Sequence, residues 1–470
     1  MNIKHLEIKI PNENPFENCK LERKKYADVL TNIINSYTNG FVLAINNKWG
    51  TGKTTFVNMW QQDLKNKGHK TVYFNAWEND FEDNPLTALM GELKTLTKKS
   101  TEPEFKNTLK KAAILSKNIA PIIVQAIADK YIDTKGIKEA IVGVTKGLSD
   151  VFENEVNEYA KKKKSISEFK KSLSEFIVNT YEGKPLIFII DELDRCRPNY
   201  AVSILEQVKH FFSVPNVVFV LSIDKTQLGN AVKGVYGSDF IDSDEYLRRF
   251  IDLEYSIPEP EADVFYKYLF EYYQFNEFFD SAERKQIHEL QSDSERFLRV
   301  SKLLFTNKNV PLRQQEKIFG LARVALRSFN ANNYVVPHIF IFLAFIKITN
   351  SEFYQNLKNK KLTLTQVQEE YLVTIESNKN DDTENELMWL EVYLVNFYHN
   401  YLESRHYRKK LYEYDKENSS NKLLIDSIIN KEKNSSFLNI LENIHRGRSE
   451  GDLDLGYFIN RLELLENLKT

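Results

Sequence analysis

The chain has 470 residues, which is too long for one compact core, so we expect two or three domains. Its 64 basic and 66 acidic side chains give a formal net charge of -2, a balance that does not indicate nucleic acid as a partner, although it leaves room for a local basic patch. Two cysteines, Cys19 and Cys196, are too few for a disulfide scaffold or a four-cysteine zinc site and favour a reducing, cytoplasmic location.

The apolar segments argue against a membrane protein. The first 18 residues alternate polar and apolar side chains and lack the apolar core of a secretory signal. No run of about 18 uninterrupted apolar residues occurs, so we expect no ordinary spanning helix. The stretch 119–128 (IAPIIVQAIA) is too short to cross a bilayer and fits a buried helix, a partner-binding helix or a membrane-surface segment.

Taken in chain order, the first part of the chain alternates between strand and helix patterns. Alternating polarity predicts a short strand at 3–10, and helical spacing predicts a helix at 21–36 that ends before Gly40. The apolar run 41–45 (FVLAI) predicts a buried strand, which is followed by a loop and a helix to about residue 67. A second strand at 70–75 and a helix at 85–99 come next.

The middle of the chain interrupts this alternation and then resumes it. Residues 100–180 carry no strand pattern and are expected to form a helical insertion, in which Lys161–Lys164 is a solvated helix face or a basic contact patch. Two apolar strands at 186–190 and 217–223 flank a helix at 200–212. Apolar strands separated by helices indicate an α/β fold with a parallel sheet that is covered on both faces.

Helical patterns dominate after Pro258 and Pro260. We therefore expect an α/β core with its insertion at 1–260, a helical lid or sensor region at 261–345, and a C-terminal helical domain at 346–470. The stretch 338–348 (HIFIFLAFIKI) is apolar on almost all sides, which suggests burial between helices or in a partner interface. This favours a homo-oligomer, or a protein partner that binds the C-terminal helices.

A glycine-rich loop follows the first buried strand. Residues 47–54 (NKWGTGKT) match the phosphate-binding pattern G-x-x-x-x-G-K-[ST] except at Asn47, which stands where the pattern has glycine. We interpret Asn47 as a residue able to adopt the unusual backbone conformation of that position. Gly50 and Gly52 let backbone N–H groups turn toward phosphate oxygens at the start of a helix, and Lys53 reaches the β- and γ-phosphates.

The expected ligand of this loop is a nucleoside triphosphate, ATP in the simplest interpretation, bound with Mg²⁺. The Thr54 hydroxyl can hold the magnesium ion. Asp224 ends the strand 217–223, where it either senses the γ-phosphate or caps the following helix. The residues expected to contact the nucleotide are Asn47, Lys48, Trp49, Gly50, Thr51, Gly52, Lys53, Thr54, Thr55 and Asp224.

A second motif places carboxylates at the end of the strand 186–190. In LIFIIDELDR, Asp191 and Glu192 directly follow the apolar run, where a carboxylate can face the phosphate loop across the sheet edge. Asp191 would hold magnesium through water, and Glu192 would act as general base on the attacking water; the alternative is that the two residues cap a helix. Asp194 and Arg195 form either a structural ion pair or part of a catalytic or subunit-contact surface.

Hydrolysis of a triphosphate is assisted by positive charge beyond lysine and magnesium, and an arginine of the same or a neighbouring chain commonly provides it. Arg249 lies just before the change to helical sequence, and Arg313 lies at the start of a predicted helix. Both are candidates for nucleotide sensing and catalysis, with a surface or ion-paired position as the alternative.

These elements together resemble the KAP family of P-loop NTPases. The resemblance extends over roughly residues 15 to 325 and is carried, in order, by LERKKYADVL, NKWGTGKTT, VYFNAWEND, IIDELDRC, VVFVLSIDKTQL, EYLRRFIDLEYSIP and PLRQQEKIFG. It implies a P-loop fold with an additional strand and a long helical insertion between the two nucleotide motifs. In many members that insertion carries membrane-spanning helices, whereas here its apolar stretch is too short.

The same resemblance implies that Trp77 packs at the site or relays its state to the insertion, with a buried core position as the alternative. Glu192 stands where many members have aspartate. Bacterial relatives often belong to phage-exclusion or conflict systems. We therefore expect a Mg²⁺-dependent ATPase that acts as a regulatory switch or assembly motor in anti-phage defence. A non-hydrolysing scaffold that recruits partners through its C-terminal helices is the alternative, and a nucleic-acid effector is the third hypothesis.

Overall fold

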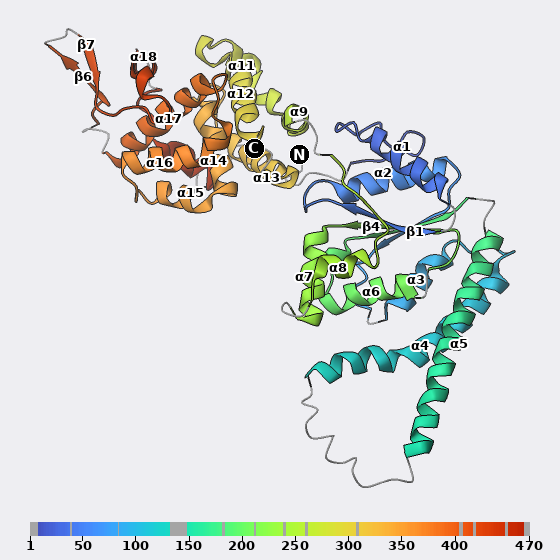
Figure 1. The fold of residues 1–470 in the computed structure, drawn as a ribbon. Helices are drawn as coiled ribbons and strands as arrows, with labels where there is room; N and C mark the ends of the chain where they lie inside the picture. The colour runs from blue at the N-terminus through green and yellow to red at the C-terminus, as the bar shows by residue number, and fades with distance from the viewer. Residues whose placement is uncertain are drawn as a thin grey trace. The chain divides into compact units, whose positions relative to one another are not determined.

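The computed structural model divides the chain into two compact units, one formed by Ile8–Pro258 and the other by the residues from Glu259 onward (Figure 1). The residues described are 8–37, 40–82, 84–131, 148–180, 184–210, 213–237, 241–258, 262–306, 310–403, 408–416, 420–446 and 450–464, with the backbone alone described at 117–131, 148–155 and 262–263. The strand expected at 3–10 lies mostly outside these residues, and 8–10 form no strand.

The first unit is built on a five-stranded sheet whose neighbouring strands are all parallel. Its strands stand in the order β2-β3-β4-β1-β5. They are β1 (Phe41–Asn46), β2 (Thr71–Asn75), β3 (Leu186–Asp191), β4 (Val217–Ile223) and β5 (Leu253–Tyr255). The predicted α/β fold with a parallel sheet is confirmed, and β5 is an additional short strand that sequence periodicity did not indicate.

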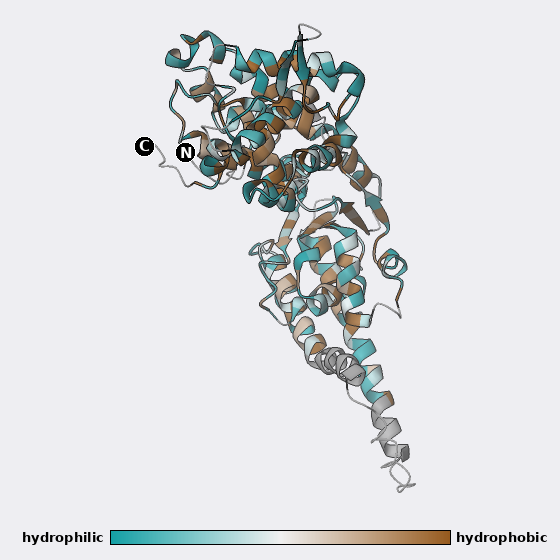
Figure 2. Cartoon of the chain, turned by 90° about the vertical axis from the view of Figure 1, so that its left-hand side faces the viewer, coloured by the Kyte–Doolittle hydropathy of each residue, from teal (hydrophilic) through white to brown (hydrophobic). Residues whose placement is uncertain are grey.

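Alternation along the strands explains why both faces of the sheet are covered. Ile187, Ile189 and Val220 belong to one core with helices α1 (Lys24–Ser36) and α2 (Lys53–Asn66). Their neighbours Phe188, Ile190 and Leu221 belong to a second core. The helices that contribute to this second core include α3 (Pro85–Lys94), α6 (Pro198–His210) and α7 (Lys225–Tyr236). Figure 1 shows the two helix layers on opposite sides of the sheet, and Figure 2 shows the strands as mainly hydrophobic.

A pair of long helices, α4 (Glu102–Tyr131) and α5 (Leu148–Thr180), forms the expected insertion between β2 and β3. Phe105 packs on Phe176, and Lys111 forms an ion pair with Glu168 at 2.8 Å. Three of the four lysines at 161–164 are exposed, as a solvated helix face requires. The side chains of the apolar stretch 119–128 lie outside the described residues.

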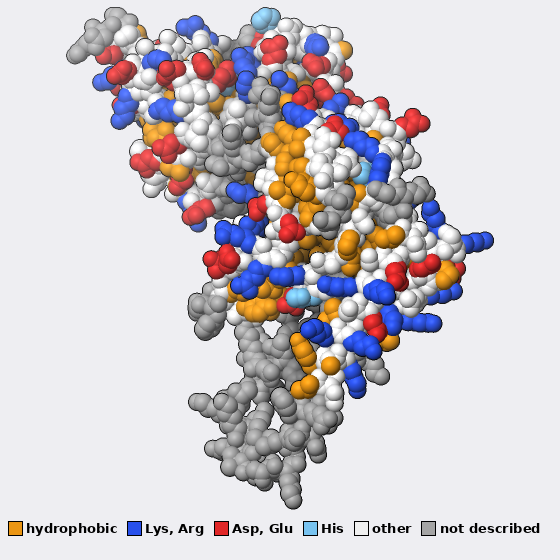
Figure 3. Space-filling model, turned by 45° about the vertical axis from the view of Figure 1, so that its right-hand side comes forward, with side chains coloured by type: hydrophobic (Ala, Val, Ile, Leu, Met, Phe, Trp, Pro, Cys, Tyr) orange, Lys and Arg blue, Asp and Glu red, His pale blue; other side chains and the backbone are white. Residues whose placement is uncertain are grey.

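Among the described helices, none has an apolar stretch of sufficient length to cross a bilayer. On the face of the molecule shown in Figure 3, basic and acidic side chains are interspersed. The exposed charge on this face is therefore mixed rather than of one sign.

Within its described residues, the second unit is helical apart from one antiparallel hairpin, β6 (Tyr412–Asp415) and β7 (Ser420–Leu423), which was not expected from the sequence. Its central helix α14 (Pro337–Thr349) has every side chain from Pro337 to Ile346 buried. This helix includes residue 345, where we expected the helical lid or sensor region to end and the C-terminal domain to begin. It packs against helices that precede it in the sequence and against helices that follow it. The other α-helices after β5 are α9 (Ala262–Tyr272), α10 (Phe275–Phe279), α11 (Ala282–Lys285), α12 (Asp293–Phe305), α13 (Leu312–Leu326), α15 (Ser351–Lys358), α16 (Leu364–Ile375), α17 (Glu384–Leu402), α18 (Asn434–His445) and α19 (Leu455–Leu462).

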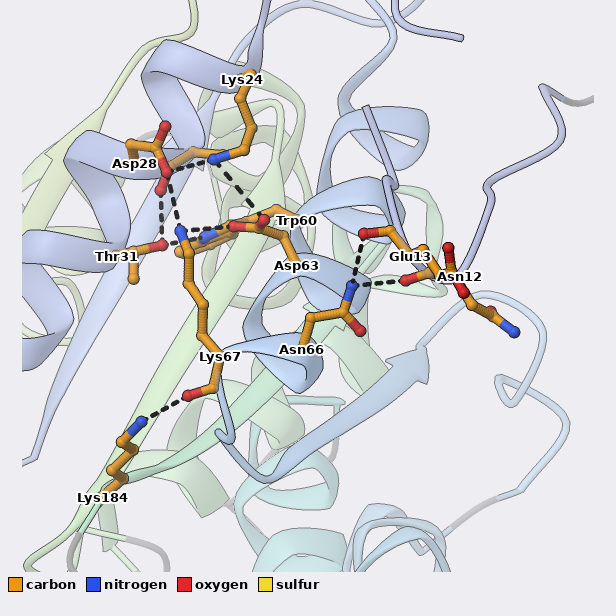
Figure 4. Close-up of polar contacts among 11 residues, drawn as sticks. Asn12, Glu13, Lys24, Asp28, Thr31, Trp60, Asp63, Asn66, Lys67 and Lys184 are labelled. Carbon is orange, nitrogen blue, oxygen red and sulfur yellow. Dashed lines mark hydrogen bonds and ion pairs between the residues drawn. The ribbon is translucent and has the colours of Figure 1, made fainter. Parts of the chain in front are cut away.

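A polar network joins α1 to α2, the helix that begins at the glycine-rich loop (Figure 4). Lys67 Nζ lies 2.8 Å from Asp28 Oδ1 and 2.8 Å from Asp63 Oδ2. The fully buried Trp60 donates its indole N–H to Thr31 Oγ1 at 3.0 Å. These contacts hold α2, and with it the end of the loop, in a defined position against α1.

Replacing Thr31 with valine should test this anchor. The variant keeps the shape of the side chain but leaves the buried Trp60 N–H without its acceptor, which should lower the free energy of unfolding by about 1–3 kcal/mol. Chemical denaturation followed by tryptophan fluorescence measures the loss. Thr31→Ser keeps the hydroxyl and should lose less. Equal stability of the valine variant and the native chain would show that the hydrogen bond contributes nothing.

Candidate nucleotide-binding site

The glycine-rich loop connects the end of β1 at Asn46 to the start of α2 at Lys53. Gly50 and Gly52 both adopt left-handed backbone conformations, with φ of 80° and 79°. A side chain disfavours this conformation, which is why glycine is needed at these two places. The loop therefore turns sharply into the positive end of α2, the arrangement that suits an anion. Thr54 and Thr55 lie half-buried in the first turn of the helix.

Lys53 is buried at this turn and is held by the loop itself. Its Nζ donates to the backbone oxygens of Asn47 at 2.5 Å and of Lys48 at 3.2 Å. Burial lowers the pKa of Lys53, and the nearby carboxylates of three aspartates oppose this shift, namely Asp194, Asp224 and Asp191. The phosphate-loop lysine and the carboxylates expected from the second motif are thus close enough to interact electrostatically.

Asn47 does not have the left-handed backbone conformation that we expected for it, so that part of the interpretation is wrong. Instead its side-chain amide pairs with the backbone of Ile257, donating from Nδ2 to the Ile257 oxygen at 2.8 Å and accepting from the Ile257 N–H at 2.9 Å. Glycine has no side chain with which to form these two bonds. Asn47 thus connects the loop to the segment after β5, which ends the first unit at Pro258.

Trp49 connects the same loop to the ends of two strands. Its indole N–H donates to Asp194 Oδ2 at 2.5 Å, and the same oxygen accepts the backbone N–H of Asp224 at 3.0 Å. Asp194 lies in the short 3-10 helix η3 (Leu193–Arg195) after β3, and its burial raises the pKa of its carboxyl group. The alternative of an ion pair between Asp194 and Arg195 is wrong, because Asp194 accepts from Trp49 and Arg195 pairs elsewhere.

Asp224 follows β4 and forms the N-terminal cap of α7. Its Oδ1 accepts the backbone N–H groups of Thr226 and Gln227 at 3.1 and 3.3 Å. The capping alternative considered for this residue is therefore observed. The same carboxylate also acts on the charge of Lys53, so capping does not remove Asp224 from the site.

The last residue of β3, Asp191, is fully buried. Its Oδ2 accepts the Tyr73 hydroxyl at 3.0 Å, and its Oδ1 accepts the backbone N–H of Glu192 at 2.9 Å. These bonds orient a carboxylate at the carboxyl-terminal edge of the sheet, where the sequence placed it. Tyr73 lies on β2, so the neighbouring strand positions this group.

Glu192 has a left-handed backbone with φ of 58°, an unusual conformation for a residue with a side chain. Its Oε1 pairs with Arg195 Nη1 at 2.7 Å, and its Oε2 accepts from Asn75 Nδ2 at 3.3 Å. Burial raises the pKa of Glu192, and the Asp191 and Asp194 carboxylates raise it further, whereas Arg195 and Asn75 lower it. Strained backbone with a perturbed carboxyl group is typical of functional positions.

Arg195 also lies beside an aromatic side chain, with its guanidinium 5.6 Å from the centre of the Trp77 ring. Trp77 is 53% exposed. The alternative of a buried core tryptophan is therefore wrong, and Trp77 lies next to the Arg195–Glu192 pair.

The two arginines expected to complete the site are both exposed. Arg249 follows α8 (Ser243–Arg248) in the first unit. Arg313 lies in the first turn of α13, in the second unit. Their proposed roles in nucleotide sensing stay predictions.

Two contributors to the loop environment were not assigned a role from the sequence. Asn75, at the end of β2, bonds Glu192, and Arg23 donates to the backbone oxygens of Thr51 and Gly52. Both lie in segments that carried the family resemblance, FNAWEND and LERKKYADVL. Their position in these segments was the sequence feature that could have indicated a role at the site, but it did not show which atoms each residue contacts.

Comparison with known proteins identifies the family of this chain. The model of the KAP family P-loop domain matches residues 23–387 of the chain. The chain belongs to the KAP family. The match includes the glycine-rich loop, the carboxylates after β3 and part of the second unit.

Two curated proteins are similar to this KAP protein over part of its length. The phage T7 exclusion protein of Escherichia coli (strain K12) is 22% identical over 242 residues, which are 47% of this chain and 30% of that relative. The chain thus spans less than a third of that relative. An uncharacterized protein of Methanocaldococcus jannaschii is 30% identical over 164 residues, 30% of this chain and 83% of the relative.

Among solved structures, the ORC2 protein of Aeropyrum pernix, in ADPNP and ADP complexes, matches 90% of this chain and 94% of its own at 11% identity, with a TM-score of 0.35.

The donors in this KAP protein fit the Mg²⁺ ion that accompanies nucleotides in P-loop proteins. Magnesium prefers oxygen ligands and takes only one or two carboxylates from the protein, with phosphate and water oxygens as the remainder. Thr54 offers a hydroxyl oxygen in the first turn of α2, and Asp191 offers an oriented carboxylate that interacts with Lys53. A hydroxyl with a carboxylate is therefore a suitable pair of protein groups.

The left-handed backbone of Glu192 gives a prediction for stability. Glycine normally makes a protein less stable than alanine does, by about 0.5–1 kcal/mol. At position 192 the order should reverse, with Glu192→Gly about 1 kcal/mol more stable than Glu192→Ala, because only alanine retains the Cβ that strains the left-handed backbone. Denaturant unfolding compares the two variants. Glu175, exposed on α5, is the control site, where the normal order should hold. The normal order at 192 would contradict the prediction.

Proposed function

We propose that this KAP-family protein binds ATP with Mg²⁺ and hydrolyses it. The observation that carries the proposal is the arrangement at the carboxyl edge of the sheet. There the buried Lys53 interacts electrostatically with Asp191, Asp194 and Asp224. Glu192, the residue after Asp191, has a strained backbone and a raised pKa. Lysine, hard oxygen donors and an adjacent glutamate are the groups that phosphoryl transfer from a nucleotide requires.

Each residue then has a defined part in the reaction. The loop N–H groups and Lys53 bind the phosphates, and Thr54 and Asp191 would hold the metal, which neutralises charge on the phosphate oxygens when bound. Glu192 accepts a proton from water as the water oxygen bonds to the γ-phosphorus. The bond from the γ-phosphorus to the bridging oxygen breaks, leaving ADP and phosphate.

Nucleotide binding also has a route to the rest of the chain through Asn47. Its backbone oxygen accepts from Lys53, while its side chain holds the backbone of Ile257, next to the last residue of the first unit. Phosphate oxygens are stronger acceptors for an ammonium than a carbonyl is, so bound nucleotide would compete for Lys53. We propose that this coupling makes the protein a regulatory switch or assembly motor.

The similarity to the phage T7 exclusion protein supports a role in anti-phage defence. We propose that role as the biological setting of the ATPase, with a second copy of the chain or another protein as its partner. Arg249 or Arg313 would then act on nucleotide in the same or a neighbouring chain. The mixed surface charge in Figure 3 gives no preference to nucleic acid as partner.

One observation favours the alternative of a non-hydrolysing scaffold that recruits partners through its C-terminal helices. Both carboxylate oxygens of Glu192 are already bonded, one to Arg195 and one to Asn75. A base held in this way must exchange at least one of these bonds for water before it can act. A protein in which that exchange does not occur would bind nucleotide without turning it over.

Two substitutions separate binding from hydrolysis. Lys53→Ala should abolish ATP binding, whereas Glu192→Gln should preserve binding and lower phosphate release by on the order of 10²- to 10³-fold, because the amide cannot accept the proton. Calorimetry measures binding, and a phosphate-release assay with and without Mg²⁺ measures turnover. Lys65→Ala, an exposed lysine of α2, is the control and should leave both unchanged.

The outcomes distinguish the candidate functions. If the native chain does not bind ATP, both the ATPase and the nucleotide-dependent scaffold are disproved. Binding without phosphate release leaves the scaffold as the function. Phosphate release that is equally fast in the native chain and Glu192→Gln excludes Glu192 as the base.

The Asn47 pair has its own test. In the native chain the Ile257 amide should exchange its hydrogen slowly, and ATP with Mg²⁺ should change that rate. Asn47→Gly should speed exchange about tenfold and remove the response to ATP, since both bonds to Ile257 are lost. Hydrogen-exchange mass spectrometry of the peptide ending at Pro258 measures this. Asn47→Asp keeps the acceptor oxygen but loses the donor, so its exchange rate should lie between those of the native chain and Asn47→Gly. Unchanged exchange in Asn47→Gly would disprove the coupling.

A further inference from the structure

Arg23 lies directly before α1 and reaches the glycine-rich loop, 28 and 29 residues further along the chain. Its Nη2 donates to the backbone oxygen of Thr51 at 2.8 Å, and its Nη1 donates to the backbone oxygen of Gly52 at 3.1 Å. The side chain is buried, with only 4% of the residue exposed. A single guanidinium thus holds two successive peptide groups of the loop.

The partners of Arg23 here are carbonyl groups, not carboxylates, so these contacts do not neutralise its charge. Burying a charged group is unfavourable unless its hydrogen bonds and surroundings compensate. Burial lowers the pKa of Arg23, as expected for such a group, and a guanidinium still remains charged at neutral pH. The chain therefore keeps a positive charge within hydrogen-bond distance of the loop backbone, where it favours an anion bound to the same loop.

Peptide geometry shows what the two bonds do. In a trans peptide group the C=O and the following N–H point in opposite directions. The carbonyl of Thr51 shares its peptide group with the N–H of Gly52, and the carbonyl of Gly52 shares its own with the N–H of Lys53. Because Arg23 holds both carbonyls toward itself, both N–H groups point away from Arg23.

The fit between Arg23 and the loop is close. A Cβ atom placed on Gly52 would lie 3.0 Å from Arg23 Nη1, tighter than an ordinary contact. Gly52 also has the left-handed backbone that only glycine adopts easily. Its carbonyl accepts from Phe56 N at 3.1 Å as the first bond of α2, so Arg23 acts on the peptide at the start of the helix.

We propose that Arg23 is a positioning residue of the phosphate loop, which orients the N–H groups of Gly52 and Lys53 toward the phosphates of a bound polyphosphate. This inference rests on the proposed nucleotide binding and deepens it. A purely structural role for Arg23, as a brace between α1 and α2, is the competing explanation. Lys24, Asp28 and Lys67 also contribute to this brace. The contribution of Arg23 to the brace can therefore be measured separately, as a change in stability.

The test uses the full chain and tripolyphosphate, a probe that carries the phosphates without base or sugar. Arg23→Met removes both donors, and Arg23→Lys keeps the charge but loses the planar pair of donors. Calorimetry gives the affinity for tripolyphosphate and for ATP with Mg²⁺, and thermal unfolding without ligand gives stability. The control is Lys25→Met, which removes an exposed positive charge from α1, two residues after Arg23, where the ammonium lies over the Tyr26 ring.

Arg23→Met should weaken binding of both probes by about 10- to 100-fold, the range for losing hydrogen bonds to a charged group. Arg23→Lys should restore part of the affinity, and Lys25→Met should match the native chain. Native affinity in Arg23→Met overturns the proposal, even if its unfolding temperature falls. If Arg23→Met does not fold, an Arg23→Lys affinity within twofold of the native value overturns it. A native chain that binds neither probe instead refutes the proposed function.

Discussion

The buried ammonium of Lys53 is the constraint around which the carboxyl edge of the sheet is arranged. Removing a positive charge from water is unfavourable, and the chain offsets this cost with two loop carbonyls and three carboxylates. Asp191 is the last residue of β3 and Asp194 follows that strand, while Asp224 follows β4, the strand between β3 and β1. The strand order therefore decides which carboxylates reach the lysine, and the same order places Glu192 beside them.

A second constraint is the fixed conformation of the loop that presents Lys53. Three side chains hold it, each through a different part of the fold: Asn47 pairs with the backbone after β5, Trp49 bonds the short helix after β3, and Arg23 bonds from the start of α1. A loop tied at several points keeps its N–H groups in place before a ligand arrives, which lowers the entropy lost on binding. The same contacts couple the conformation of the loop to movements of the segments that hold it.

Local chemistry explains why much of the fold could be predicted. The strands at 186–191 and 217–223 are apolar except for Asp191 and Ser222, and both are buried along their whole length. The helix at 337–349 is apolar on almost all sides and is the centre of the second unit. In contrast, β5 at 253–255 is short and partly exposed, and the hairpin of β6 and β7 is polar, so neither carries an apolar period.

The sequence by itself determined most of the elements and the residue types at the edge of the sheet, because strand and helix periods and the conformational freedom of Gly50 and Gly52 depend on neighbouring residues. Only the tertiary structure decided which side chains are partners. Asp194 bonds Trp49 instead of the adjacent Arg195, and Asn47 bonds Ile257, 210 residues away. The physical reason is that partners are set by distance in space, which the strand order and the packing of helices on the sheet establish.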